Sequence, residues 1–355
     1  MGITVNKEKI INFAFRLMSI ILALAFTSIV VIAAKANPLT AYGHLFNGAF
    51  SSVKKVSDSL VAWIPLIITC CGLAVTFTVG LWNIGIEGQI TLGAVFTTGV
   101  IRLLLDLPVS PALVLTAAII AGCLGGMLWA LIAGFLKFFG GVSEIFAGLG
   151  LNFIATGINL YLIFGPWKRP GVASMSGTEP FSDTLRLPNF TDLRLSPWSL
   201  ILAIISVVIV HLLLKKTMIG LRMKAVGKNA DAAKLMGISS FRYMMLAFII
   251  CGFFAGLAGA LQVTAVYYRL IPSISSGYGF LGLLVTMLVD YQVLWAAPVA
   301  FLFSALNIGG IQLPIEMKLD STLAGIVQSA LVLFYLVMDS IRKNMIDPKG
   351  ASAHE

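Results

Sequence analysis

The chain has 355 residues, of which 59% are hydrophobic and only 11% are charged. Because about a quarter of the residues in soluble domains are charged, this composition excludes a soluble globular protein. The formal net charge of +9 needs no nucleic-acid partner, since basic residues beside a bilayer face anionic lipid. We therefore predict a multi-pass protein of the cell (inner) membrane that contacts lipid and binds no nucleic acid.

Apolar runs of about 20 residues, the length at which a helix crosses the hydrocarbon core, recur along the chain. The first is longer than the core of a signal peptide, so we interpret it as a retained helix. The predicted spans are residues 13–34, 60–80, 87–105, 111–136, 143–164, 197–214, 244–265, 280–291, 293–309 and 321–339, with Asp290-Tyr291-Gln292 as the turn between two short spans. The predicted fold class is all-α, a transmembrane bundle of about ten helices that forms a single domain over residues 1–355.

Lysine and arginine predict the orientation of the chain, because they accumulate in cytoplasmic loops. Seven of the 24 lie in loop 215–243. With a cytoplasmic N-terminus and ten spans, fourteen of the 24 lie on the cytoplasmic side. We therefore place both termini and loop 215–243 in the cytoplasm, and loop 166–196 on the extracytoplasmic side.

Cysteine and histidine suggest neither catalysis nor metal binding. The four cysteines lie inside apolar runs without paired spacing, and the three histidines are scattered. A membrane-embedded enzyme would need a clustered set of reactive groups, and none can be nominated. We therefore expect no catalytic residue, no metal site and no cofactor bound by this chain.

Loop 215–243 contains a short helix with both ends marked. Asn229 is a typical N-cap, Asp231 lies in the first turn, where negative charge is favoured, and Gly237 suits the left-handed position after the last turn. Leu235 and Met236 lie on this helix, in a basic loop that has little of its own to cover them. We expect another protein to cover the helix. The alternative is an ordinary basic loop with a fortuitous helix.

A family resemblance rests on this loop and the span after it. The pattern Gly227-x-Asn229-x-x-Ala232-Ala233-x-x-x-Gly237-Ile238 resembles the coupling-loop signature of ABC importer permeases. The chain is similar, over roughly residues 60–340, to the branched-chain amino acid, ribose and nucleoside permease family. The resemblance implies a type II importer-like fold in which the short helix docks on an ATPase subunit. The implied coupling residues are Gly227, Asn229, Ala232, Ala233, Leu235, Met236 and Gly237.

Gly252, Gly256 and Gly259 follow the loop in the next predicted span. Gly252 with Gly256, and Ala255 with Gly259, are small residues four apart, a spacing that lets two helices approach closely in lipid. We interpret these glycines as helix-packing residues, and this role requires no part in transport.

A second motif, Gly80-Leu81-Trp82-Asn83-Ile84-Gly85-Ile86-Glu87-Gly88-Gln89, interrupts two spans with glycine. Broken backbone at membrane depth is tolerated only against protein or a water-filled cavity, and a carboxylate there points inward or to water. Asn83, Glu87 and Gln89 therefore either line the translocation path or tie helix ends together. The motif resembles an element of nucleoside and simple-sugar permeases, particularly the longer permease subunit of nucleoside uptake systems.

A third group consists of Glu144 at the entrance of one span and Asn152 and Asn159 within it. The two amides are seven residues apart and share a helical face, where they either bind a solute or bridge helices. Glu144 resembles a glutamate of the nucleoside subgroup, whereas residues 145–150 lack its hydroxyl-rich run, so the exact solute stays open. The predicted path residues are Asn83, Glu87, Gln89, Glu144 and Asn152.

The chain has no G-x-x-x-x-G-K-[ST] phosphate-binding loop, so ATP and Mg are expected on partner ATPase subunits. The resemblance implies three partners: an ABC ATPase, an extracytoplasmic substrate-binding protein and a second permease, expected to be a paralogue in a heterodimer. The expected function is import of nucleosides or a related simple sugar, without ATPase activity of this chain. The alternatives are ribose or riboflavin as the solute, or an ion-coupled secondary transporter, for which no inverted repeat is evident.

Overall fold

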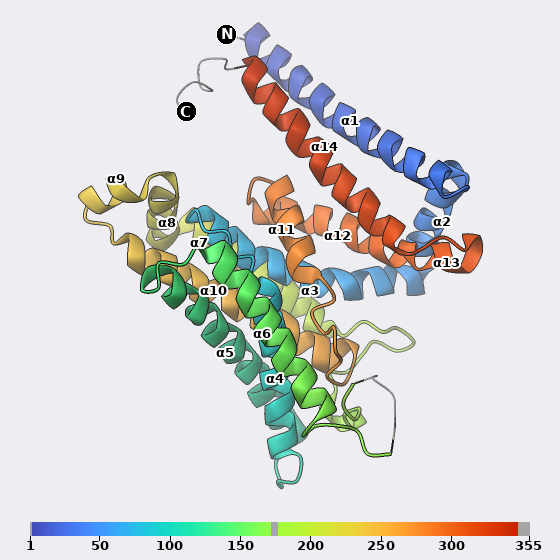
Figure 1. Ribbon diagram of the computed structural model, residues 1–355, viewed down its shortest axis with the longest axis vertical. Coiled ribbons are helices and arrows are strands. Elements are labelled where there is room, and N and C mark those ends of the chain that lie inside the picture. Colours follow the sequence, from blue (N-terminus) through green and yellow to red (C-terminus); the bar gives the residue numbers. More distant parts are fainter. Residues whose placement is uncertain (1, 172–176, 347–355) are drawn as a thin grey trace. The chain divides into compact units, whose positions relative to one another are not determined.

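The computed structural model describes residues 2–171 and 177–346 (Figure 1). Part of the predicted extracytoplasmic loop, residues 172–176, lies outside the described residues, as does Lys349, which was counted as cytoplasmic. Every regular element in the described ranges is a helix, which confirms the all-α prediction. The elements are α1 Gly2–Ala33, α2 Pro38–Phe50, α3 Val53–Thr78, α4 Ile86–Leu104, α5 Pro111–Phe138, α6 Glu144–Phe164, η1 Asp183–Leu185, α7 Pro197–Lys216, α8 Met218–Lys228, α9 Ala230–Leu235, α10 Ser240–Leu261, η2 Gln262–Val266, α11 Tyr278–Leu288, α12 Val293–Gly310, α13 Gln312–Met317 and α14 Thr322–Ile346.

A helix lies at each of the ten positions predicted as spans. Seven helices of the described chain are long and apolar enough to cross a membrane, and the pair α1 and α2, bent by 109°, adds an eighth if it counts as one span. Helix α11 is shorter than a full span. The chain is therefore a multi-pass membrane protein, and the count of ten spans stays a prediction.

The bend between α1 and α2 was not predicted from the sequence. Lys35 has a positive φ of 59°, Pro38 stands at the start of α2, and the Asn37 side chain accepts a hydrogen bond from the Leu39 amide at 2.9 Å. A capping side chain followed by proline starts a new helix. The thirteen residues of α2 are too few for a span, which is why hydropathy alone did not mark them.

Contacts divide the described chain into two compact units, one up to Ser59 and from Leu302 onward, the other Leu60–Phe301. In the first unit, α1 and α14 run side by side (Figure 1). Its buried cluster includes Val31, Leu45, Leu313 and Val327. The prediction of one domain over the whole chain stays a prediction.

Helices α4, α5 and α10 form the packed centre of the second unit. An ideal Cβ built on Gly256 would lie only 2.9 Å from Cys123 Cα, and one on Gly252 only 2.8 Å from Met127 Cα, both on α5. An ideal Cβ on Gly259 would lie 2.8 Å from the Ala94 amide nitrogen of α4. Only glycine permits these backbone approaches, so the three glycines lie where three helices meet.

The surface of the second unit is apolar along its helices. Phe146, Phe153 and Tyr161 are exposed along α6, and Ile205, Val208 and other large apolar residues are exposed on α7. A soluble protein would bury such residues, whereas lipid or another transmembrane chain accommodates them. Helices α8 and α9 lie at one end of this unit and residues 177–196 at the other (Figure 1).

Candidate functional site

The loop between α7 and α10 forms two helices, α8 and α9. Thr217 caps α8, its Oγ1 accepting a hydrogen bond from the Gly220 amide at 3.1 Å. Asn229 has an extended backbone conformation and separates α8 from α9. It caps α9, and its Oδ1 accepts hydrogen bonds from the amides of Asp231 at 3.1 Å and Ala232 at 2.9 Å. Gly237 follows with φ of +77°. Helix α9 therefore begins and ends at the residues that the sequence indicated, whereas α8 was not predicted.

Helix α9 presents an apolar surface at the end of the second unit. Leu235 is 91% exposed and Met236 is 79% exposed, while Ala233 is only 2% exposed and faces the chain itself. Ala232 is exposed beside them. A helix of six residues is not stable in water by itself, and it is anchored here by a hydrogen bond of 2.9 Å from Ser240 Oγ to the Ala230 carbonyl. The implied coupling residues thus include a surface of Ala232, Leu235 and Met236 that is open to a partner.

The C-terminal end of α8 is pressed against the end of α3. An ideal Cβ on Gly227 would lie 3.0 Å from the Thr78 carbonyl carbon and 3.2 Å from that of Val79. Directly after this contact the chain leaves helical geometry until α4 begins at Ile86, with Gly80 in a left-handed conformation (φ +81°). The loop carrying the first motif therefore packs, backbone against backbone, on the break that forms the second motif.

Polar side chains close this break. The amides of Asn83 and Gln89 form two reciprocal hydrogen bonds, Nδ2 to Oε1 at 3.1 Å and Nε2 to Oδ1 at 3.0 Å. Asn83 Nδ2 also donates to Cys251 Sγ of α10 at 3.1 Å. Asn152 of α6 accepts from the Gly88 amide at 2.8 Å and donates to the Ile84 carbonyl at 2.9 Å. The break is thus satisfied by protein groups, as membrane depth requires.

The carboxylate of Glu87 joins α4 to the start of α11. It is 7% exposed, and its Oε1 accepts hydrogen bonds from the amides of Gly279 at 3.1 Å and Phe280 at 3.2 Å. The N-cap residue of α11 is Gly277, which has no side chain to accept hydrogen bonds from these amides. A negative group at a helix N-terminus satisfies free amides and the helix dipole together.

The two remaining predicted polar residues lie elsewhere. Glu144 forms an ion pair of 2.6 Å with Lys137 across the turn between α5 and α6. Asn159 donates to the carbonyls of Ile271 at 3.0 Å and Pro272 at 2.9 Å. Of the two interpretations open from the sequence, the hydrogen bonds of Asn83, Gln89 and Asn152 support the tie between helices.

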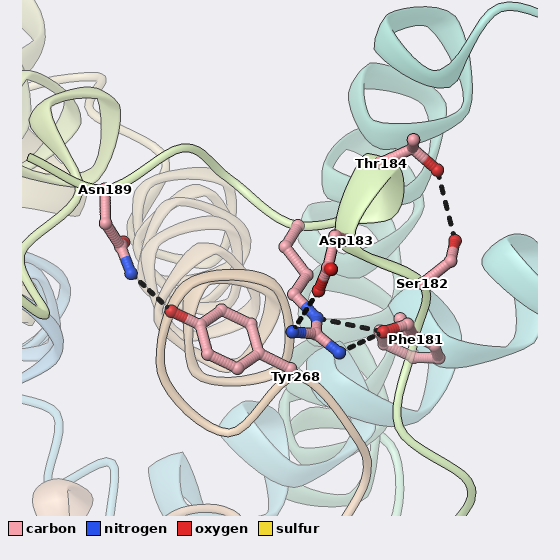
Figure 2. Close-up of polar contacts among 7 residues, drawn as sticks. Phe181, Ser182, Asp183, Thr184, Asn189 and Tyr268 are labelled. Atoms are coloured by element: carbon pink, nitrogen blue, oxygen red, sulfur yellow. Dashed lines mark hydrogen bonds and ion pairs between the residues drawn. The ribbon is translucent and has the colours of Figure 1, made fainter. Parts of the chain in front are cut away.

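The opposite end of the unit carries contacts that the sequence did not indicate (Figure 2). The Arg186 guanidinium lies 4.9 Å from the ring centroid of Tyr268, pairs with Asp183 and donates to the Phe181 carbonyl at 2.6 and 2.9 Å. Asn189 Nδ2 donates to Tyr268 Oη at 2.7 Å. These groups hold the segment before α7 against the segment after α10. Only the i,i+3 spacing of Asp183 and Arg186 was visible in the sequence.

A cavity of about 430 Å³ lies beside the contact between α8 and α3. Three lysines contribute to its wall, Lys215, Lys224 and Lys228, and so do Asp290 and Tyr291 of the turn before α12. Asp290 and Tyr291 both have positive φ, 48° and 63°, which fits the turn predicted there. The cavity leaves open space between loop 215–243 and this turn.

Comparisons with known proteins give a consistent assignment. Residues 56–336 match the family of permease components of branched-chain amino acid transport systems. The guanosine ABC transporter permease protein NupP of Bacillus subtilis is 30% identical over 344 residues, covering 95% of this chain and 97% of that protein. The glucose ABC transporter permease protein TsgB13 of Haloferax volcanii is 27% identical over 336 residues, 92% and 87% of the two chains. A second Bacillus subtilis relative, the guanosine ABC transporter permease protein NupQ, is 29% identical over 277 residues, 73% and 83% of the two chains.

The tie at Glu87 makes the first prediction. Glu87→Leu removes the acceptor of two backbone amides, and leaving a buried donor unsatisfied costs about 1–3 kcal/mol. We expect a lower free energy of unfolding and a lower melting temperature in detergent. Glu87→Gln keeps a carbonyl acceptor, so its free energy of unfolding should fall much less. Glu316→Leu, at an exposed position of α13, should leave the free energy of unfolding unchanged. Equal melting of the Leu and Gln variants at position 87 would contradict the tie.

Proposed function

The chain belongs to the permease-component family of branched-chain amino acid transport systems, and on that premise we propose that it is the permease subunit of an ABC importer for nucleosides or a related simple sugar. The near full-length similarity to a guanosine permease, with 97% of that protein covered, is the observation that carries the solute class. The similarity to a glucose permease keeps a simple sugar within the proposal. The chain itself is a multi-pass protein of the cell membrane.

Helix α9 is proposed to couple transport to ATP hydrolysis on a partner subunit. Leu235 and Met236 are exposed at one end of the second unit. Exposed apolar side chains on an anchored helix suit the groove of a partner, since covering them removes apolar area from water. That partner is an ABC ATPase, which would bind ATP and Mg, because the chain contains no phosphate-binding loop of the G-x-x-x-x-G-K-[ST] type. In this proposal the chain binds no cofactor and hydrolyses no ATP.

Movement of α9 would be transmitted to the membrane-spanning helices through backbone contacts of α8 with α3. Gly227 lies on Thr78 and Val79, and the break after Val79 is tied through Glu87 to α11 and through Asn152 to α6. A push on α9 would therefore act on α3, α11 and α6. Such coupling requires that ATP state favour one of two arrangements by differential contact energy.

Two further partners complete the proposed assembly. An extracytoplasmic substrate-binding protein would deliver the solute to the end that carries residues 177–196. A second permease subunit would enclose the path together with this chain. Both NupP and NupQ of Bacillus subtilis are named guanosine permease proteins and both resemble this chain, which supports a paralogue rather than an identical copy as the second subunit.

The solute class is tested by uptake. We expect a strain lacking this gene to lose energy-dependent uptake of labelled nucleosides, or of glucose, and to regain it when the gene is restored. Labelled ribose and riboflavin are measured in the same assay. Loss of ribose or riboflavin uptake alone would discard the solute class while leaving the ABC permease. Unchanged uptake of every solute would contradict the function as a whole.

The docking surface is tested by Leu235→Glu and, separately, Ala232→Glu. Each places a charge where an apolar contact is proposed, and a charge buried without a partner costs well over 1.4 kcal/mol, a factor of ten in binding. We expect wild-type amounts of protein in the membrane and uptake reduced about tenfold or more. Leu235→Met, which keeps the apolar surface, should transport normally. Wild-type uptake by Leu235→Glu would show that α9 is only a surface helix.

A further inference from the structure

The end of α10 changes geometry at Gln262. Residues Gln262–Val266 form a π-helix, and the Tyr267 amide donates to the Gln262 carbonyl at 2.9 Å, five residues back. A π-helical turn is rare, is less favourable than a continued α-helix, and occurs frequently at functional sites. The turn displaces the backbone so that the following side chains face directions that a regular α10 would not give them.

The side chain of Gln262 is buried without a hydrogen-bond partner. It is 1% exposed, and neither its Nε2 nor its Oε1 is hydrogen-bonded in the described chain. Ser196, at the N-cap of α7, is also 1% exposed and has an unpartnered Oγ. An amide offers two donors and an acceptor, and leaving such groups unpaired in the interior is costly. This differs from Asn83, Gln89 and Asn152, whose amides are all bonded within the chain.

Both side chains line one small cavity. Its volume is about 10 Å³, and its wall includes Gln262, Ser196 and Ser199 together with Val61 and Pro65 of α3. This volume is at the lower limit of the space that one water-sized group, a water molecule or a single hydroxyl, requires. Arg194 lies at the same cavity but is exposed. Apart from the exposed Arg194, the residues that line this cavity are uncharged, and Gln262, Ser196 and Ser199 are the polar ones among them.

The cavity lies at the extracytoplasmic end of the predicted topology. The Leu187 amide donates to the Thr264 carbonyl of the π-helix at 3.0 Å, and the Phe181 amide donates to the Tyr268 carbonyl at 2.8 Å. The Arg186 and Asn189 contacts of Figure 2 hold the same two segments together. The π-helix thus packs against residues 181–187, in the loop that the predicted topology places on the extracytoplasmic side.

We propose that Gln262, with Ser196, is a solute-contact site that accepts one hydroxyl group of a neutral, hydroxyl-bearing solute. A hydroxyl both donates and accepts, so it pairs with the amide of Gln262 and the hydroxyl of Ser196 at once. An anion would find no buried cation here, and a bare ring carbon would leave the amide unpaired. The proposal rests on the proposed function, because nucleosides and simple sugars are solutes of this chemistry, and it names the residues that would distinguish one hydroxyl pattern from another.

Gln262→Met is the test variant, because methionine has a similar length and no hydrogen-bonding amide. Thr264→Val is the matched control on the same π-helix, since the Thr264 hydroxyl donates to its own helix, to the Ala260 carbonyl at 2.8 Å. Each variant replaces the gene in a strain that carries the complete transporter. The probes are labelled guanosine with its 2′-deoxy and 3′-deoxy analogues, and glucose with 2-deoxyglucose.

The measured quantity is the ratio of KM values between a deoxy analogue and its parent. One hydrogen bond of about 0.5–1.5 kcal/mol gives the wild type a ratio of about 2 to 12 for the analogue that lacks the contacted hydroxyl. Gln262→Met should bring that ratio close to one, mainly by raising the KM of the parent solute. Thr264→Val should keep the wild-type ratio.

Three outcomes overturn the proposal in distinguishable ways. If Gln262→Met lowers uptake of all probes equally and keeps the ratio, Gln262 serves packing or an ordered water only. If the wild type accepts every analogue as well as its parent, no hydroxyl is read at this site. If the wild type takes up none of the probes, the proposed solute class fails first, and this inference fails with it.

Discussion

The contact of Gly227 with the backbone of Thr78 and Val79 is the constraint on which the rest of the second unit depends. It joins the loop that carries the exposed apolar helix α9 to the break between α3 and α4. A side chain at position 227 would have to displace peptide groups rather than flexible side-chain atoms, and peptide groups in a packed helix end yield little. The two motifs, whose first glycines Gly80 and Gly227 are 147 residues apart in the sequence, therefore pack against each other.

The polar residues of the break follow from this arrangement. A backbone that leaves helical geometry inside a membrane needs partners for its amides and carbonyls. Asn152 supplies them to Ile84 and Gly88, while Asn83 and Gln89 satisfy each other and Glu87 serves the first amides of α11. Each of these residues would be costly alone in an apolar span. Together they form a network that stabilises the break and links it to α6, α10 and α11.

Local patterns predicted a large part of this structure. The apolar runs marked the positions of ten helices, and capping by Asn229 with a left-handed Gly237 marked the ends of α9. The small-residue spacing around Gly256 predicted close helix packing. These features depend on length, hydropathy or a few neighbouring residues, so one sequence is enough to read them.

Contacts between distant segments were not predictable in the same way. Nothing local to Glu87 indicates that its partners are the amides of Gly279 and Phe280, 192 and 193 residues further along. The π-helix at Gln262 lies inside a run that reads as an ordinary apolar span, and the Arg186 contact with Tyr268 crosses from one loop to another. From the sequence, Glu87 could either line the translocation path or tie helix ends together, because only the packing of distant segments distinguishes the two roles.

The most direct measurement is the number of ATP molecules hydrolysed per solute transported by the complete transporter in proteoliposomes, comparing wild type with Gly227→Val and Gly141→Asn. Gly141 lies in the turn between α5 and α6, and asparagine tolerates its left-handed conformation (φ +65°), where an added Cβ meets open space. If the contact of Gly227 with α3 transmits movement, Gly227→Val hydrolyses ATP with little or no transport, and Gly141→Asn behaves as wild type. A wild-type ratio in Gly227→Val would contradict the account.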